Sequence, residues 1–220
     1  MIALGIFSSL RSRNFALYFT GQCISLCGSW IQQVAMSWLV YRLTGSIILL
    51  TSVIFVHQIP NLIMPLFAGV ISDRYDKRRI IIITQLLLMI QSLTLALLML
   101  SGKAEVWHLF VLATFSGCVL AFEAPVRQSF YTKLVPAENM ANAIALNSAT
   151  INISRFIGPT IGGILIAWVG EGWCFLINCV SFLAMLTALS MMRVQFFTYE
   201  SAQTGVLQSF REGVNYIWKT

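Results

Sequence analysis

His57 and Arg155 stand inside long apolar stretches of this chain and are its first candidates for chemistry. His57 has an unperturbed pKa near physiological pH, so its imidazole can bind and release a proton. A charge in the middle of a bilayer costs at least about 2.5–3.5 kcal/mol, and we therefore expect Arg155 to face a cavity or a partner group. Both residues are candidates for proton coupling or for contact with an anion. A neutral, hydrogen-bonded imidazole is the alternative for His57.

Uncharged polar side chains accompany these two candidates at helical spacing. In the first apolar stretch they recur every three or four residues, which places them on one face of a helix. A water-filled cavity beside that face is the favoured interpretation. Hydrogen bonding between helices, worth about 0.6 kcal/mol per bond on average, is the alternative. Besides His57 and Arg155, the candidate residues of a substrate pathway are Gln22, Ser25, Ser29, Gln33, Gln58, Asn61, Ser116, Asn147 and Asn152.

The sequence lacks the motifs of common covalent chemistry. It contains no Gly-x-x-x-x-Gly-Lys-[Ser/Thr] loop for ATP, no His-Glu-x-x-His zinc motif and no Gly-x-Ser-x-Gly elbow. Its five cysteines form no Cys-x-x-Cys pair. We therefore expect no catalytic residue, no metal and no cofactor, which means that the protein is not an enzyme.

The elements that carry the polar side chains are membrane-spanning helices. Charged residues make up 10% of the 220 residues, hydrophobic residues 58%, and the mean hydropathy is +0.80. A soluble domain has about 25% charged residues, so a soluble enzyme and a disordered chain are excluded. Each apolar stretch matches the thickness of a bilayer as a helix, without the alternation of a membrane barrel. The predicted spans are approximately 15–41, 46–71, 80–100, 106–122, 141–169 and 173–192.

The placement of Lys and Arg predicts the orientation of these spans. Of the 14 basic residues, all but Arg42, Lys103 and Arg155 fall on the side that holds both termini, and Arg127 is among them, in the fourth connection. The positive-inside rule places that side in the cytoplasm. The net charge of +6 is thus a topology signal, and no nucleic-acid partner is expected. The predicted parts are a cytoplasmic segment 1–14, a bundle 15–192 and a cytoplasmic amphipathic tail 193–220.

The second connection resembles a loop motif of the major facilitator superfamily, Gly-x-x-x-Asp-Arg-x-x-[Arg/Lys]-[Arg/Lys]. The matching positions are Gly69, Asp73, Arg74, Lys77 and Arg78, while Asp76 replaces the usual glycine before the basic pair. In that superfamily the loop latches the two halves in the outward-facing state. An acid near the cytoplasmic end of helix four commonly pairs with its basic residues, and the resemblance gives that role to Glu123.

Two further stretches strengthen the resemblance. Gly158, Pro159, Gly162 and Gly163 match the Gly-Pro-x-x-Gly-Gly packing element on helix five of superfamily exporters. Residues 125–148 are similar to the enterobactin-exporter-like branch. The chain thereby resembles the first six of twelve helices, with a three-plus-three inverted repeat.

The expected protein is an all-α polytopic membrane protein with six transmembrane helices in one major-facilitator-type bundle. The resemblance implies a half-length permease of the bacterial inner membrane, exporting a siderophore or hydrophobic drug-like solute with proton coupling. Its expected partners are the lipid bilayer, a small-molecule solute, protons and a second six-helix bundle from the same or another chain. The alternative is a non-transporting membrane subunit or truncated remnant, in which the polar residues hold helices together.

Overall fold

The structure, a computed structural model, describes residues 8–65 and 75–193, which form helices and no β-strand. Within these ranges six helical stretches are long and apolar enough to cross a membrane, which confirms the predicted number. They are α2 (Arg13–Thr44), Ile47–Pro65 beginning with α3 (Ile47–Gln58), α5 (Lys77–Leu100), α6 (Val106–Tyr131), α7 (Met140–Val169) and α8 (Glu171–Met191). Short 3-10 helices are η1 (Ser8–Arg11), η2 (Thr132–Leu134) and η3 (Ala137–Asn139).

The short connection between α2 and α3 follows from local turn chemistry. Gly45 ends α2 in the left-handed conformation at φ 63°, and its N–H donates to the carbonyl of Tyr41. Glycine adopts this conformation without a steric penalty. Ser46 then begins α3, because its hydroxyl oxygen accepts a hydrogen bond from the N–H of Leu49. Two residues are therefore enough to reverse the chain.

The fourth helix is longer than predicted. We expected it to end near Phe122, whereas α6 continues to Tyr131 and places Arg127 inside the helix, not in a connection. The prediction was wrong because it treated charges as the end of the span. Glu123 and Arg127 lie one turn apart and form an ion pair. Because the two charges balance each other, the helix can continue through both residues.

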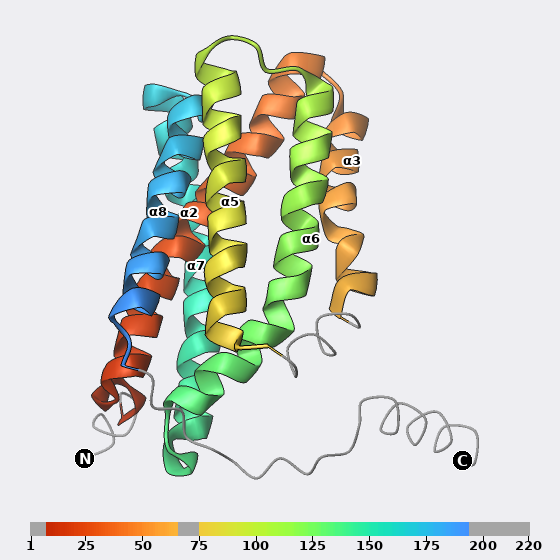
Figure 1. Ribbon diagram of the computed structural model, residues 1–220. Helices are drawn as coiled ribbons and strands as arrows, with labels where there is room; N and C mark the ends of the chain where they lie inside the picture. The colour runs from red at the N-terminus through yellow and green to blue at the C-terminus, as the bar shows by residue number, and fades with distance from the viewer. Residues whose placement is uncertain (1–7, 66–74, 194–220) are drawn as a thin grey trace, which may run out of the picture.

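Helix α2 occupies the middle of the bundle and packs most extensively against α8 and α7 (Figure 1). Its glycines allow the contact with α8. A Cβ atom at Gly28 would lie 2.2 Å from the hydroxyl oxygen of Ser181, and one at Gly21 would lie 2.9 Å from the Cβ of Ala188. These distances are too short for a side chain, and glycine therefore lets the two backbones approach closely.

Helix α7 contacts α2 through only part of its glycine motif. A Cβ atom at Gly158 would lie 2.3 Å from the Cβ of Trp30, and one at Gly162 would lie 3.3 Å from the Cα of Ile31. Gly163 has nothing within 4 Å of the same position. Gly158 and Gly162 thus form the packing surface, while Gly163 points away from α2.

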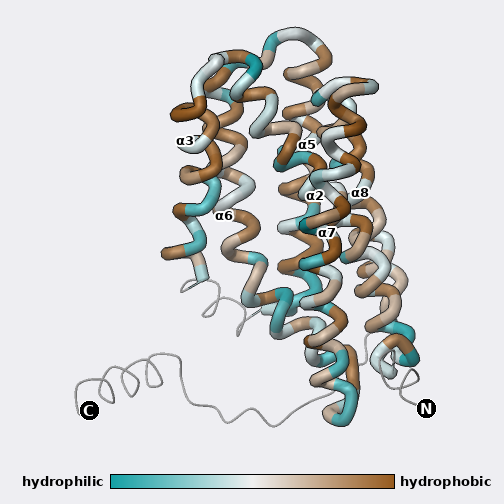
Figure 2. The backbone as a smooth tube through the Cα atoms, turned by 180° about the vertical axis from the view of Figure 1, so that it is seen from behind, coloured by the Kyte–Doolittle hydropathy of each residue, from teal (hydrophilic) through white to brown (hydrophobic). Residues whose placement is uncertain are grey.

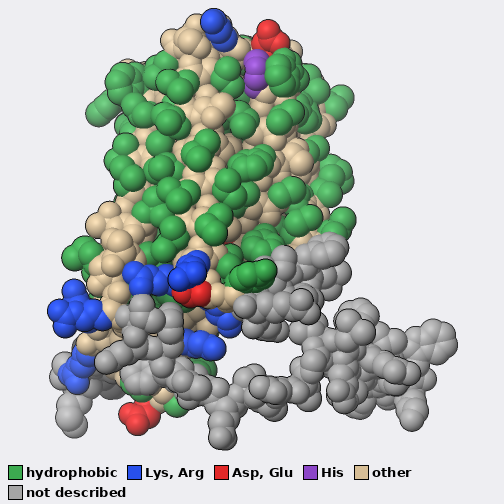
Figure 3. Space-filling view, in the orientation of Figure 1, with side chains coloured by type: hydrophobic (Ala, Val, Ile, Leu, Met, Phe, Trp, Pro, Cys, Tyr) green, Lys and Arg blue, Asp and Glu red, His purple; other side chains and the backbone are tan. Residues whose placement is uncertain are grey.

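The outside of the bundle is apolar, as a membrane protein requires. Figure 2 shows hydrophobic residues along most of each helix, with hydrophilic residues within α2, α3 and α7. In the space-filling view the hydrophobic side chains cover the middle, and Lys and Arg gather at the end where α2 begins and α8 ends (Figure 3). Burial is uneven among the spans. In their apolar stretches, 11% of the residues are buried in Ile47–Pro65 and 22% in the span that contains α7, whereas 44–50% are buried in the other four.

The α7 motif gives a matched pair of variants. We expect Gly158→Ala to lower the free energy of unfolding by about 1–3 kcal/mol, because the new methyl group overpacks the contact with Trp30. Gly163→Ala should be neutral or slightly stabilising, since alanine favours a helix over glycine by up to about 1 kcal/mol. Thermal unfolding of purified protein in detergent measures both. Equal effects of the two substitutions would contradict the packing role of Gly158.

Candidate functional site

Two adjoining cavities lie within the bundle. The larger has a volume of about 630 Å³ and is lined by residues of α2, α5, α6, α7 and α8 together with Asn61. The smaller, of about 90 Å³, is lined mainly by α2, α3 and α6, with Leu88 of α5 and Phe182 of α8. Ser29 and Gln33 line both cavities, which makes α2 their common wall. The two cavities therefore share the face of α2 that carries these polar side chains.

Eight of the predicted pathway residues line these cavities. Four of them belong to the polar face of α2. The residues lining the larger cavity are Gln22, Ser25, Ser29, Gln33, Asn61 and Asn147, and those lining the smaller one include His57 and Ser116.

Three predicted pathway residues do not line either cavity in the described part of the chain. Gln58 is exposed, and its side-chain oxygen accepts a hydrogen bond from the amide of Asn61 at 2.6 Å. Asn152 is exposed, and its amide donates to the carbonyl of Ser148. Arg155 is also exposed, with its guanidinium carbon 5.3 Å from the centroid of the Trp30 ring. The aromatic face thus provides a favourable contact for this cation.

His57 is held by hydrogen bonds to α6. Its Nδ1 atom lies 3.0 Å from the carbonyl oxygen of Ala113 and 3.3 Å from the hydroxyl oxygen of Ser116. A Cβ atom at Gly117 would lie 2.2 Å from the backbone oxygen of His57, so glycine is needed at this contact. The His57 ring also borders the smaller cavity.

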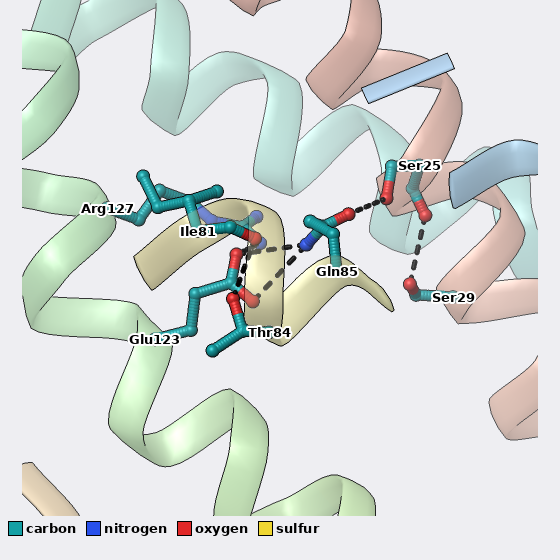
Figure 4. A network of polar contacts seen from close by, with 7 residues as sticks. All are labelled: Ser25, Ser29, Ile81, Thr84, Gln85, Glu123 and Arg127. Atoms are coloured by element: carbon teal, nitrogen blue, oxygen red, sulfur yellow. Dashed lines mark hydrogen bonds and ion pairs between the residues drawn. The ribbon is translucent and has the colours of Figure 1, made fainter. Parts of the chain in front are cut away.

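A buried carboxylate lies in the wall of the larger cavity. The side chain of Glu123 is 1% exposed and forms an ion pair with Arg127, whose side chain is 15% exposed. The amide nitrogen of Gln85 donates to both carboxylate oxygens, at 3.0 and 3.2 Å. The hydroxyl of Ser25 in turn donates to the amide oxygen of Gln85 at 3.4 Å. Figure 4 shows this chain of contacts, which joins α6 to α5 and α2.

The residues of the predicted loop motif are only partly visible. Gly69, Asp73 and Arg74 lie outside the described residues, as does the predicted amphipathic tail. Lys77 contacts the hydroxyl of Ser129 on α6. The guanidinium of Arg78 donates to the carbonyls of Leu189 and Ser190 in the last turn of α8, where carbonyls have no acceptor role within the helix. Pairing of Glu123 with the loop stays a prediction.

Sequence reasoning missed a second buried polar network. The side-chain amide of Gln32 donates to the oxygen of Gln91 at 3.0 Å, and its own oxygen accepts from Asn178 at 2.8 Å and lies 2.6 Å from the hydroxyl oxygen of Ser92. None of these four residues is among the candidate residues predicted from the sequence. Gln85 and Gln91, which are six residues apart in one apolar span, were the available signal.

No group of three or more His, Cys, Asp or Glu side chains that could hold a metal occurs within residues 8–65 and 75–193. The predicted spans contain charges, amides and hydroxyls that contact one another and border cavities. Such an arrangement can bind a polar solute or a proton, and it can hold helices together.

The family of transmembrane secretion effectors matches residues 4–219. Among curated relatives, the staphyloferrin A transporter of Staphylococcus aureus (strain NCTC 8325 / PS 47) is 30% identical over 78% of this chain and 44% of its own length. The multidrug efflux pump Tap of Mycolicibacterium fortuitum is 26% identical over 88% of this chain and 49% of its own. The enterobactin exporter EntS of Shigella flexneri is 27% identical over 56% of this chain and 30% of its own.

The chain thus spans half or less of the length of these relatives. The family match covers nearly all of its residues, and the six apolar helices agree with a multi-pass membrane protein. The chain belongs to the major facilitator superfamily of membrane transporters, in the family described as transmembrane secretion effectors.

Proposed function

We infer that this chain forms one wall of the pathway of a secondary transporter that exports a siderophore or a hydrophobic drug-like solute. The observation that carries this proposal is the cavity of about 630 Å³, which has amide, hydroxyl and charged side chains in its wall and lies inside a bundle with a largely hydrophobic outer face (Figure 3). A cavity of this volume is within the range of small-molecule sites. The relatives named as a staphyloferrin A transporter, an enterobactin exporter and a multidrug efflux pump support the same class of solute.

A second six-helix bundle is proposed to form the opposite wall. The exposed face of α7 carries a charged and an amide side chain, Arg155 and Asn152, beside large apolar ones such as Phe156. Lipid would solvate the apolar residues but not the guanidinium, which costs at least about 2.5–3.5 kcal/mol at mid-bilayer. A partner bundle or water between the bundles would remove that cost. The same chain or another chain is proposed to supply the partner.

The proposed mechanism is a rocking of the two bundles around the cavity, coupled to protons. His57 borders the smaller cavity and Arg155 lies on the face proposed to meet the partner, so these residues are proposed for coupling or for contact with an anion. The loop residues, together with Glu123, are proposed as the gate. Both termini are proposed to lie in the cytoplasm of a bacterium, because Lys and Arg gather at that end of the bundle.

Cysteine labelling tests the orientation. Ser101 and Glu138 are exposed residues at opposite ends of the bundle, and the five natural cysteines all lie in apolar helices. In intact cells a membrane-impermeant maleimide should label Ser101→Cys, and it should label Glu138→Cys only after the membrane is permeabilised. The natural chain is the background control. Labelling of Glu138→Cys from outside would reverse the proposed topology.

Solute flux tests the function of the whole 220-residue chain. Liposomes that contain the reconstituted chain should accumulate the drug-like dye Hoechst 33342 when their lumen is acidic. A protonophore should abolish this accumulation. If two copies must meet, the rate should rise more steeply than linearly with protein per vesicle. Absence of accumulation at every protein density would contradict transport by this chain and favour a non-transporting subunit.

Substitutions in the common wall test the pathway in the same assay. Gln33→Ala should lower the rate about fivefold, because one hydrogen bond worth about 1 kcal/mol is lost to the solute. Thr94→Ala is the matched control, since the Thr94 hydroxyl bonds to the carbonyl of Ile90 within its own helix and borders neither cavity. Equal rates for the two variants would remove Gln33 from the pathway.

A further inference from the structure

A third cavity is an open groove on the outside of the bundle, between α5 and α6. It has a volume of about 350 Å³, and none of its described lining residues borders the two inner cavities. Its walls include the exposed Ile83 and the neighbouring Ile80 and Leu87 of α5, Phe122 of α6, and Met64. It lies in the half of the bundle where α5 begins, and Lys and Arg gather at that end (Figure 3). We call it the outer groove.

The lining of the outer groove suits a hydrocarbon chain. Apart from Thr84 and Cys118, its described side chains are hydrocarbons or a thioether. The hydroxyl of Thr84 donates to the carbonyl of Ile81 in its own helix at 2.9 Å, and a thiol such as that of Cys118 is a weak donor. In a bilayer such a groove fills with a lipid chain, because an empty volume would lose the dispersion contacts of its walls.

Three basic residues begin α5, and they have different surroundings. The guanidinium of Arg78 binds carbonyls of α8. Lys77 contacts the hydroxyl of Ser129 on α6, the other helix of the outer groove. The side chain of Arg79 is 84% exposed. A cationic group therefore reaches toward α6, and a second one remains accessible from the lipid and the water.

The positions of Lys77 and Arg79 on the helix place them at the mouth of the outer groove. Lys77 lies one turn before Ile80, and Arg79 lies one turn before Ile83, so each precedes a lining residue on the same face of α5. Long basic side chains at a helix end extend to the membrane surface, where lipid phosphates lie. The order from the surface inward is thus cation first and apolar groove second, which is also the order within a phospholipid.

The one acid beside these cations is held by the helix. One carboxylate oxygen of Asp76 accepts a hydrogen bond from the N–H of Arg78 and caps α5. The other lies 3.8 Å from Nε of Arg79, and both side chains of this pair are exposed. An exposed ion pair of this kind contributes little to stability, so Arg79 can exchange it for a phosphate.

We propose that the outer groove and the first turn of α5 form a binding site for phosphatidylglycerol, an anionic phospholipid. One acyl chain occupies the groove between α5 and α6, and the phosphodiester lies between the ammonium of Lys77 and the guanidinium of Arg79. Basic pockets between membrane helices bind anionic head groups in this way. The bound lipid contacts both helices from outside the bundle, away from the two inner cavities.

Charge selects this lipid among those with the same chains. The phosphodiester is the sole charged group of phosphatidylglycerol. Phosphatidylcholine has the same phosphodiester and adds a choline cation, which would lie near Lys77 and Arg79 and be repelled by them. The acyl chain contributes equally in the two lipids, so the difference between their affinities measures the contribution of the two basic residues.

Native mass spectrometry of the purified full chain in detergent tests the site with these two lipids carrying identical acyl chains. Phosphatidylglycerol should bind up to about 25-fold more tightly than phosphatidylcholine, because each of two cations contributes about fivefold. Glycerol 3-phosphate, which lacks the chains, should not displace bound phosphatidylglycerol. Its displacement of the lipid would reveal a site for free phosphate and contradict the role of the groove.

Two charge variants with a matched control test the head-group contacts. Arg79→Gln and Lys77→Gln should each weaken binding of phosphatidylglycerol about fivefold and leave phosphatidylcholine unchanged. Arg13→Gln removes an exposed cation from the first residue of α2, at the same end of the bundle, and should change neither affinity. Loss of phosphatidylglycerol binding to the same extent in all three variants would reduce the effect to general surface charge and overturn the proposal.

A second matched pair tests the groove itself. Ile83→Trp places a large ring at the edge of the outer groove and should weaken binding of both lipids. Ile90→Trp makes the same change two turns further along the same face of α5, where the side chain is exposed and outside the groove, and should have no effect.

Elution from a sizing column accompanies each measurement and shows that the variants are folded. Equal affinity for the two lipids, or equal binding by Ile83→Trp and Ile90→Trp, overturns the proposal. A dimer that Ile83→Trp converts to a monomer would assign the outer groove to a second copy of the chain and overturn it as well.

Discussion

The close approach of α2 to its neighbours is the constraint on which the remaining structure depends. Glycines make these contacts possible on two sides of α2. Gly21 and Gly28 of α2 face α8, and Gly158 and Gly162 of α7 face α2. In a bilayer there is no hydrophobic force between helices, so association relies on such tight contacts and on interhelical hydrogen bonds. Because α2 lies at the centre, its polar face becomes the common wall of both cavities.

The polar groups of the bundle fall into two sets with different consequences. The amides of Gln32, Gln91 and Asn178 satisfy one another between α2, α5 and α8 and serve as contacts between helices. The pair of Glu123 and Arg127 borders an open volume and is joined to α5 through Gln85. The bundle thus contains both polar side chains that bond between helices and polar side chains that border a cavity.

The sequence predicts the helices well and the partners of their side chains poorly. Length and hydropathy locate α5 within three residues at its start, because a bilayer requires a minimum apolar length. The end of α6 was misplaced because Glu123 and Arg127 were counted as separate charges, although their spacing of one turn allows them to neutralise each other. Periodicity also cannot distinguish Gly158 from Gly163, since the side that faces α2 depends on the whole bundle.

Arg78 joins two helices that are far apart in the sequence. Its guanidinium binds carbonyls in the last turn of α8 from the first turn of α5, and at mid-height the hydroxyl of Ser92 on α5 lies 2.7 Å from the carbonyl oxygen of Phe175 on α8. Because α8 packs extensively against both α2 and α5 and is tied to α5 by these hydrogen bonds, the three helices form one block. The cavities lie between this block and α3, α6 and α7. A change in the tilt of α3 or α6 relative to this block would therefore change the width of the cavities.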